Sequence, residues 1–189
     1  MGVETEEALV ERAGGGERAA FEELVRRHAD RLFAVIVRYL GDRADAEEAT
    51  QEAFLRAWRS IGGFERRSQL FTWLCRIGLN EAKRIAARRA SRPAARSLEA
   101  EPVPDAPDWS EAPEVRLGQA EVRRVLEDAI RALPPDYRAP LILRDIEGLS
   151  TAEAAEAMEL REAAFKSRLH RARLAVRRAL DGYFLEEPR

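Results

Sequence analysis

The chain has 189 residues, of which 46% are hydrophobic and 35% are charged, and its 32 bases and 34 acids leave a formal net charge of −2. This composition is typical of a folded, helix-rich protein and excludes a fibrous or wholly disordered chain. No apolar run approaches the length of about 18 residues that a membrane span needs, and the acidic first 16 residues do not resemble a signal peptide, so we expect a cytoplasmic protein without membrane insertion of its own.

Few residues in the chain could carry out catalysis or bind a metal. Cys75 is the only cysteine, and the two histidines, His28 and His170, are far apart in the sequence. A single thiol excludes an internal disulfide and a cysteine-based metal cluster within one chain, and no glycine-rich phosphate loop is present. We therefore expect no cofactor, no metal site and no enzymatic activity, with Cys75 as a small core residue.

Three helices are predicted in the first half of the chain. An apolar stripe from Phe21 to Leu40 ends at Gly41, a second over 46–61 ends at a pair of glycines, and a third extends from 68 to about 90. Their apolar faces can share one core. Residues 17–90 are therefore predicted to form a first helical domain.

Charge is segregated along the chain. Residues 42–52 are acidic, whereas 66–96 hold nine bases and one acid. Residues 97–114 hold six acids and no base, and 161–178 return to seven bases and one acid. This alternation indicates separate basic surfaces that can bind nucleic acid and acidic surfaces that can meet a basic partner.

A linker is predicted over residues 91–118, where five prolines are scattered among acids. Fully extended, its 28 residues could reach about 90 Å, so the domains on either side need not touch. The expected architecture is all-α, with two small helical domains joined by a flexible linker. The second domain is assigned to residues 119–185.

The second domain is predicted to contain a helix-turn-helix. A stripe from Val122 to Leu133 ends at two prolines, and another over 141–146 ends before Gly148. Ser150 and Glu153 then have the spacing of a capping box, which starts a short helix. A turn near 159–161 follows; it lacks the glycine that such turns often contain.

The last helix of the motif has one apolar and one basic side. The apolar side is formed by Phe165, Leu169, Ala172, Val176 and Leu180. The opposite side carries bases and hydrogen-bonding groups that suit a DNA major groove. A solvated basic face is the alternative, but the capped short helix, the turn and the basic helix together favour DNA binding.

Four segments resemble the extracytoplasmic-function group of bacterial sigma factors. The sequence DAEEATQEAFLRAW at 45–58 and FTWLCRI at 71–77, with Asn80, are similar to sigma region 2. The sequences LPPDYR at 133–138 and KSRLHRAR at 166–173 are similar to region 4, in the expected order. Ala163-Ala164-Phe165 stands where many members have Gly-Thr-Val, so promoter preference does not transfer from relatives.

The resemblance implies that region 2 docks on the β′ clamp of RNA polymerase core and opens the −10 promoter element, while region 4 binds the β flap and reads the −35 element. Acids and an aromatic residue are implied at the clamp interface: Asp45, Glu47, Glu48, Gln51, Glu52 and Phe54. Aromatic, basic and amide side chains are implied at the −10 element: Phe64, Arg66, Arg67, Trp73, Arg76, Asn80, Lys83 and Arg84. The −35 contacts are assigned to the last helix: Lys166, Ser167, Arg168, His170, Arg171 and Arg173.

Alternatives exist for three of these assignments. The acidic helix can be a plain solvated face, Trp73 can belong to the core, and Asn80, at a position that captures a flipped base, can be a surface asparagine. For the whole chain the alternative is a stand-alone helix-turn-helix regulator, which leaves the acidic helix and the linker unexplained. An inhibitory anti-sigma partner is expected because members of the group are commonly held by one.

Overall fold

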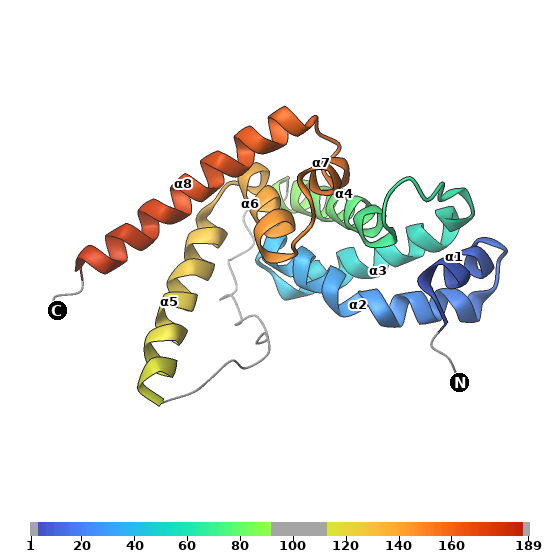
Figure 1. The fold of residues 1–189 in the computed structure, drawn as a ribbon, viewed down its shortest axis with the longest axis horizontal. Helices are drawn as coiled ribbons and strands as arrows, with labels where there is room; N and C mark the ends of the chain where they lie inside the picture. The colour runs from blue at the N-terminus through green and yellow to red at the C-terminus, as the bar shows by residue number, and fades with distance from the viewer. Residues whose placement is uncertain (1–3, 92–112, 187–189) are drawn as a thin grey trace.

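A computed structural model describes the backbone of residues 4–91 and 113–186, and every regular element in these two ranges is helical (Figure 1). The all-α class predicted from the sequence is therefore confirmed. We refer to residues 4–91 as the N-terminal unit and to 113–186 as the C-terminal unit. None of the described helices is both long enough and apolar enough to cross a membrane.

The N-terminal unit is built on three long helices that match the predicted ones: α2 (Arg18–Leu40), α3 (Arg43–Ser60) and α4 (Leu70–Ala90). Gly41 ends α2 in a left-handed conformation, with φ of +71°, which glycine adopts without strain. Asp42 then starts α3, because its carboxylate accepts a hydrogen bond from the backbone N–H of Asp45. Local sequence therefore sets the bend between these two helices.

Small side chains allow the three helices to pack closely. The buried face of α3 consists of alanines: Ala46, Ala49, Ala53 and Ala57. Gly78 has a similar role in α4, since a Cβ at this position would lie 3.0 Å from a methyl carbon of both Leu32 and Ile36. A methyl group added at Gly78 would therefore force the side chains of Leu32 and Ile36 to move.

One helix of this unit, α1 (Glu6–Gly14), is not predicted from the sequence. Thr5 caps its start by accepting a hydrogen bond from the N–H of Ala8, and one face is buried against α2 and the short 3₁₀ helix η1 (Ile61–Gly63). That face consists of Leu9, Val10 and Ala13. Three apolar positions among many acids give a pattern too short to identify a helix.

The C-terminal unit contains four α-helices: α5 (Pro113–Ala132), α6 (Pro135–Leu141), α7 (Thr151–Ala157) and α8 (Glu162–Glu186). Helix α5 begins inside the segment 91–118 that was predicted as a linker. Residues 92–112 of that segment lie outside the described residues.

Helix α6 continues into one π-helical turn, η2 (Ile142–Ile146). The N–H of Glu147 donates a 2.9 Å hydrogen bond to the carbonyl of Ile142, five residues earlier. This wider turn shifts the following side chains out of α-helical register. Ile142 and Leu143 are buried, whereas Ile146, predicted on the same apolar stripe, is 40% exposed.

Helices α7 and α8 form the predicted helix-turn-helix. The capping box is present: Glu153 N–H donates to the Ser150 hydroxyl, and Ser150 N–H donates to the Glu153 carboxylate. In place of glycine, Glu159 adopts the left-handed conformation in the turn, with φ of +56°. The turn therefore has the expected shape without the expected residue.

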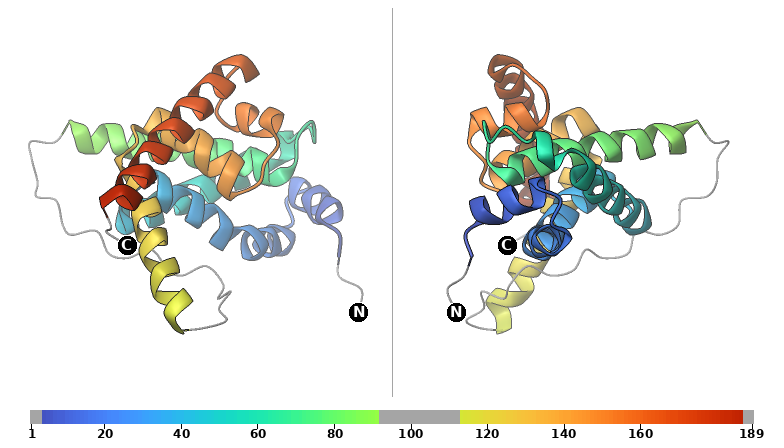
Figure 2. Two further views of the ribbon diagram at one scale, coloured as in Figure 1. Left: turned by 60° about the vertical axis from the view of Figure 1, so that its left-hand side comes forward. Right: turned by 90° about the vertical axis from the view of Figure 1, so that its right-hand side faces the viewer.

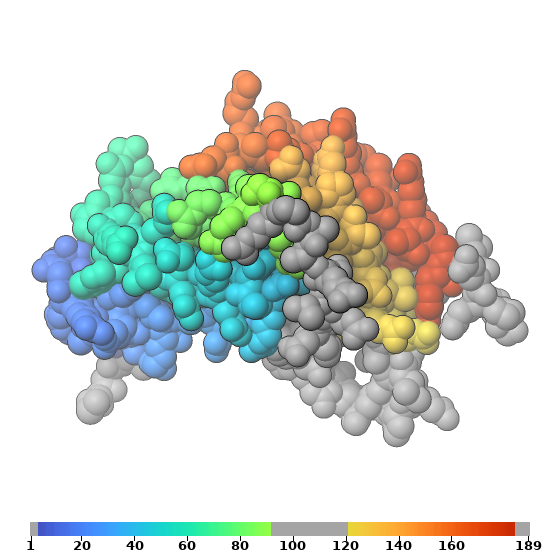
Figure 3. All heavy atoms as spheres, turned by 180° about the vertical axis from the view of Figure 1, so that it is seen from behind, coloured from blue at the N-terminus to red at the C-terminus, as the bar shows by residue number. Residues whose placement is uncertain are grey.

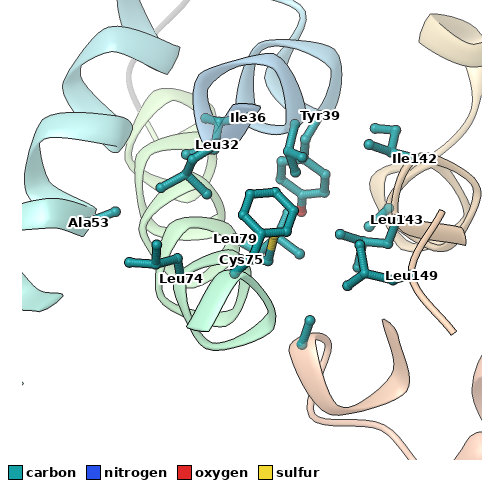
Figure 4. Close-up of a cluster of buried hydrophobic side chains, with 14 of the residues drawn as sticks. Leu32, Ile36, Tyr39, Ala53, Leu74, Cys75, Leu79, Ile142, Leu143 and Leu149 are labelled. Atoms are coloured by element: carbon teal, nitrogen blue, oxygen red, sulfur yellow. The ribbon is translucent and has the colours of Figure 1, made fainter. Parts of the chain in front are cut away.

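The two units pack against each other and share one hydrophobic core. Figure 4 shows Cys75 and Leu79 of α4 facing Ile142, Leu143 and Leu149 of the C-terminal unit, and all five side chains are buried. Helix α4 packs on α7, while α2 packs on α6 and η2, as the views in Figure 2 also show. Seen from behind in Figure 3, the green atoms of α4 border the orange atoms of the C-terminal unit. We call this the closed arrangement.

Two arginines connect the units by hydrogen bonds. Arg138 is buried, and its guanidinium donates a 2.6 Å hydrogen bond to the carbonyl of Tyr39 at the end of α2. Arg31 of α2 lies 3.0 Å from the carboxylate of Glu147 and also donates to the carbonyl of Glu147 at 2.9 Å. The sequence indicated that the domains need not touch, but the structure places them in direct contact.

Candidate nucleic-acid interface

The connection between η1 and α4, residues 64–69, carries the first predicted −10 contacts. Phe64 is half-buried, with its ring 5.0 Å from the ring of Trp73. Arg66 and Arg67 are exposed, and Arg66 has a left-handed φ of +56°. Trp73 itself is only 7% exposed, which favours its alternative role as a core residue that supports Phe64.

The outer surface of α4 carries the remaining predicted −10 contacts. Arg76, Asn80 and Lys83 follow one another at intervals of four and three residues and therefore lie along one face of the helix. Asn80 is exposed, while Arg76 and Lys83 are partly exposed. An exposed amide between two bases can bond a base edge while the cations neutralise the DNA backbone.

Arg84 belongs to an ion-pair cluster that was not predicted. The carboxylate of Glu81, only 3% exposed, lies 2.7 Å from Arg84 and 2.5 Å from Arg56 of α3. The buried carboxylate therefore fixes two half-exposed guanidinium groups beside Asn80. In the sequence Glu81 is the single acid of a basic segment, and its pairing with Arg56 depends on how α3 packs against α4.

The connection between η1 and α4 borders a cleft that also contains acidic side chains. The cleft is lined by Phe64, Arg66 and Arg67 and by carboxylates of α1 and α7: Glu6, Glu7, Glu153 and Glu156. Residues predicted to bind the −10 element thus lie next to the first helix of the helix-turn-helix.

Three acids of the predicted clamp interface are engaged in ion pairs within the unit. Asp45 shares Arg89 with Asp42, Glu47 lies 3.0 Å from Arg43, and Glu48 lies 2.8 Å from Arg88. The N–H of Asp45 and, to a smaller extent, Arg89 lower the pKa of Asp42. These pairs reduce the negative field that a basic partner would meet.

Two further residues of the predicted clamp interface lie in a groove between α2 and α3. They are Gln51 and Phe54. The apolar wall of this groove also contains side chains that were not predicted from the sequence to contact a partner: Phe21, Val25, Leu55 and Trp58. Leu55 is 49% exposed although it is large and apolar. It falls outside the inward stripe of α3, and this departure is the signal that could have identified it.

The recognition helix α8 presents its predicted faces. Phe165, Leu169, Ala172 and Val176 are buried, as expected from their spacing. The predicted −35 contacts Lys166, Ser167, His170 and Arg171 are exposed on the outer side. Arg171 also donates a 3.3 Å hydrogen bond to the hydroxyl of Tyr137.

The other two basic residues assigned to the −35 element pair with acids of their own unit. Arg173 binds Asp145 through two nitrogens, at 2.9 and 2.6 Å, and this pairing raises the pKa of the arginine. Arg168 lies 3.5 Å from Asp136. Both pairs connect α8 to α6 and η2. Arg168 and Arg173 therefore orient the recognition helix, and a contact of theirs with DNA stays a prediction.

The described residues hold no group of three or more His, Cys, Asp or Glu side chains that could bind a metal. Cys75 is buried, and its burial raises the pKa of the thiol, which keeps the sulfur protonated and unreactive. A helical unit with a basic, aromatic surface on η1, α4 and their connection, followed by a helix-turn-helix, is typical of a two-part DNA-binding protein of transcription.

Comparison with known proteins gives the family. Residues 24–92 match the family Sigma-70 region 2, and residues 123–176 match Sigma-70, region 4. The RNA polymerase sigma-H factor of Pseudomonas aeruginosa is 35% identical over 186 residues, covering 94% of this chain and 95% of the relative. The ECF RNA polymerase sigma-E factor of Haemophilus influenzae is 35% identical over 177 residues, covering 89% and 92%.

Solved structures are similar over nearly the whole chain. CnrH, in complex with the cytosolic domain of CnrY, matches with a TM-score of 0.66 and 27% identity, over 93% of this chain and 96% of that chain. The sigma factor RpoE of Bartonella quintana, in complex with the anti-sigma factor NepR, shares the fold, with a TM-score of 0.65 and 23% identity over 85% and 96%. This chain belongs to the extracytoplasmic-function (ECF) family of RNA polymerase sigma factors.

Proposed function

We propose that this sigma factor binds RNA polymerase core and directs it to specific promoters as an alternative, signal-responsive sigma factor. The observation that carries this function is the order of the two family matches, region 2 over residues 24–92 and region 4 over 123–176. A stand-alone helix-turn-helix regulator is not favoured, because it would not need a complete region 2. We keep 17–90, 91–118 and 119–185 as the functional domains.

The −10 element is assigned to the basic side of the N-terminal unit. Phe64, supported by Trp73, offers an aromatic face for an unstacked base, and exposed Asn80 can bond a base edge. The cations Arg66, Arg67, Arg76, Lys83 and Arg84 neutralise the backbone of the separated strand. Their position on one loop and one helix supports this assignment.

The polymerase interface is assigned to the groove between α2 and α3. An exposed apolar side chain beside aromatic rings is typical of a protein-protein contact, and Leu55, Phe54 and Trp58 provide this in the groove. The acids Asp45, Glu47, Glu48 and Glu52 form a polar rim toward the basic partner expected at the β′ clamp. The β flap is assigned to the C-terminal unit.

The −35 element is assigned to the outer side of α8. Lys166, Ser167, His170 and Arg171 are exposed there, and the guanidinium of Arg171 can bond two acceptors of a guanine. Because polymerase and promoters are cytoplasmic, we place the protein in the cytoplasm. Its role is regulatory rather than enzymatic, and an anti-sigma factor is the proposed inhibitory partner.

A reconstituted transcription assay tests the proposed function. The purified chain is mixed with sigma-free polymerase core and a library of promoter fragments from the host, and transcripts are mapped at their 5′ ends. We expect transcripts from a limited set of promoters that share −35 and −10 sequences. Transcription equal to that of core alone, together with tight binding of the isolated chain to duplex sites, would establish the stand-alone regulator instead.

A further inference from the structure

Ion pairs join α3 to α4 where the two helices pack against each other (Figure 2). Two of these pairs lie at the surface: Glu48 with Arg88 at 2.8 Å, and Asp45 with Arg89 at 3.0 Å. A third differs, because its acid, Glu81, is only 3% exposed and lies between two arginines. Exposed pairs do little to fix a side chain, whereas a buried acid depends on its partners for compensation of its charge.

The carboxylate of Glu81 is compensated by two guanidinium groups. Its Oε1 atom lies 2.5 Å from Nε of Arg56 on α3, and its Oε2 atom lies 2.7 Å from Nη2 of Arg84, one turn further along α4. Oε2 is buried and accepts no hydrogen bond from the described residues, so it depends on the charge of Arg84. Movement of either arginine would leave a buried negative charge with one partner fewer, which is strongly unfavourable. Both arginines are therefore held in place.

Each of the two arginines keeps hydrogen-bond donors for a ligand. The side chains of Arg56 and Arg84 are 47% and 59% exposed, and in the described part of the chain neither has an ion pair other than the one with Glu81. A guanidinium group has five N–H donors, and the buried carboxylate binds both groups from their inner side, so donors on the outer side face solvent. An anion with several oxygen atoms can therefore bind both groups at once.

The two arginines lie beside the predicted −10 contact Asn80. Arg84 follows Asn80 by four residues, so the two side chains are neighbours on one face of α4. Arg56 comes from α3 and was not predicted to bind DNA, but its ion pair places its guanidinium at the same carboxylate as that of Arg84. The backbone phosphates that flank a base at Asn80 are anions of the class that paired guanidinium groups bind well.

We infer that Glu81 is a positioning residue for nucleic acid: it aligns Arg56 and Arg84 as one site for a backbone phosphate of single-stranded DNA. The identity of that strand as the −10 element rests on the proposed function, whereas the phosphate site itself does not. The alternative is a structural role, in which Glu81 only joins α3 to α4. The two roles predict opposite changes in DNA binding when the acid is neutralised.

The first experiment measures binding of a short fluorescent single-stranded DNA to the full chain at low salt. Glu81→Gln makes the chain more positive, so electrostatic attraction alone would strengthen binding. Without the shared carboxylate, however, the two guanidinium groups repel each other and separate, so we expect about threefold weaker binding than in the wild type. Glu23→Gln is the matched control, because Glu23 also pairs with two arginines, on α2, and this variant should bind at least as tightly as the wild type.

The salt dependence of the same binding reaction counts phosphate contacts. For single strands, the slope of log K against log salt concentration is about −0.7 for each phosphate neutralised. Arg56→Gln, Arg84→Gln and Glu81→Gln should each reduce the magnitude of this slope by about 0.7, since each removes the same contact. Arg43→Gln is the control for Arg56→Gln: it lies on the same helix with nearly equal exposure, 48% against 47%, and its slope should equal that of the wild type.

Two further variants separate positioning from loss of the fold. Urea titration establishes that each variant is folded under the binding conditions. Glu81→Asp keeps the charge on a shorter side chain and should recover part of the affinity that Glu81→Gln loses. Arg56→Gln leaves Arg84 on the carboxylate, and it carries the test if Glu81→Gln does not fold. Binding by folded Glu81→Gln that equals or exceeds that of the wild type would overturn the positioning role, and a wild-type slope for Arg56→Gln would overturn the phosphate contact.

A third measurement distinguishes failure of this inference from failure of the proposed function. In complexes with polymerase core and promoter DNA, Glu81→Gln should reduce permanganate-reactive open complexes about threefold, in parallel with its loss of affinity for single-stranded DNA. If the variants lose DNA binding but the wild type forms no open complexes, the phosphate site stands and the proposed function is refuted. If the wild type opens promoters and Glu81→Gln opens them equally well, the proposed function stands and the role of Glu81 is refuted.

Discussion

The guanidinium of Arg138 donates a 2.6 Å hydrogen bond to the backbone carbonyl of Tyr39, 99 residues earlier in the chain. The same group donates to the carbonyl of Leu133 at 2.8 Å and to that of Arg131. It therefore provides hydrogen bonds for backbone carbonyls at the end of α5. Burial lowers the pKa of Arg138, yet an arginine stays charged at any physiological pH. One buried cation thus joins the carbonyl ends of two helices from different units.

Replacement of this cation should weaken the fold. We expect Arg138→Met to lower the free energy of unfolding by about 2 to 3 kcal/mol, because the carbonyls of Tyr39 and Leu133 lose their donor inside the protein. Urea titration followed by circular dichroism measures the change. Arg177→Met, which removes only an exposed pair with Asp181, should change stability by less than about 0.5 kcal/mol. Similar losses in the two variants would contradict the role of Arg138.

Promoter opening should depend on the exposed amide of α4. Asn80→Ala is expected to reduce the fraction of open complexes about tenfold or more, because a displaced base loses its hydrogen-bonding partner. Permanganate reactivity of unpaired thymines in the polymerase complex reports this step. Binding to polymerase core is the control and should not change, since Asn80 does not line the groove between α2 and α3. Normal promoter opening by Asn80→Ala would show that Asn80 is a surface residue without a role in this step.

The groove between α2 and α3 should carry the polymerase contact. Leu55→Glu places a charge in an apolar contact and should weaken core binding by about tenfold or more, while the fold is retained because the side chain is already 49% exposed. Competition against a labelled sigma factor for core measures affinity. Lys166→Ala is the matched control: core binding should persist, and recognition of the −35 element should weaken. Wild-type affinity of Leu55→Glu would remove the groove from the interface.

The backbone of the helix-turn-helix turn is strained at Glu159, and a glycine should relieve this strain. Glu159 has φ of +56°, a conformation unfavourable for residues with a Cβ. Glu159→Gly should therefore raise the free energy of unfolding by about 0.5 to 1 kcal/mol, measured as an increase in Tm. Glu159→Ala keeps the Cβ and should give no such gain. If alanine stabilises as much as glycine, the cause is the lost side chain and not the backbone.

Acid should weaken the start of α3. Hydrogen bonding from the N–H of Asp45, assisted by Arg89, lowers the pKa of Asp42 in the folded chain. The folded state thus binds this proton less readily than the unfolded state, where the pKa is about 3.9. Its stabilising contribution is present above that value and is lost as pH falls through the lower folded pKa. Asp42→Asn keeps the cap without the titration, so stability below about pH 4 should fall less steeply than in the wild type.

Much of the helical architecture is predictable because its signals are local. Gly41 ends α2, Ser150 and Glu153 start α7, and the spacing from Phe165 to Val176 identifies the buried side of α8. Each feature depends on residues within one or two helical turns. The π-helical turn at 142–146 and the helix α1 are missed, because a register change and a three-residue apolar face leave too little pattern.

The candidate site is predictable only in part, because several of its contacts join residues that are far apart in the sequence. Exposure of Lys166 and Asn80 follows from helix periodicity alone. The pairing of Arg173 with Asp145, by contrast, depends on how α8 packs against η2, and the burial of Glu81 depends on Arg56 of another helix. Closure of the two units depends on contacts such as the one between Arg138 and Tyr39. These residues are 99 positions apart, so the sequence pattern does not predict their contact.

The covalent connection through residues 92–112 changes what the interface between the units must achieve. Because both units belong to one chain, closure is an intramolecular equilibrium independent of protein concentration. An interface too weak to join two separate proteins is then sufficient to keep the chain closed. A partner that binds the open state shifts this balance only by the ratio of its affinities for the open and closed states.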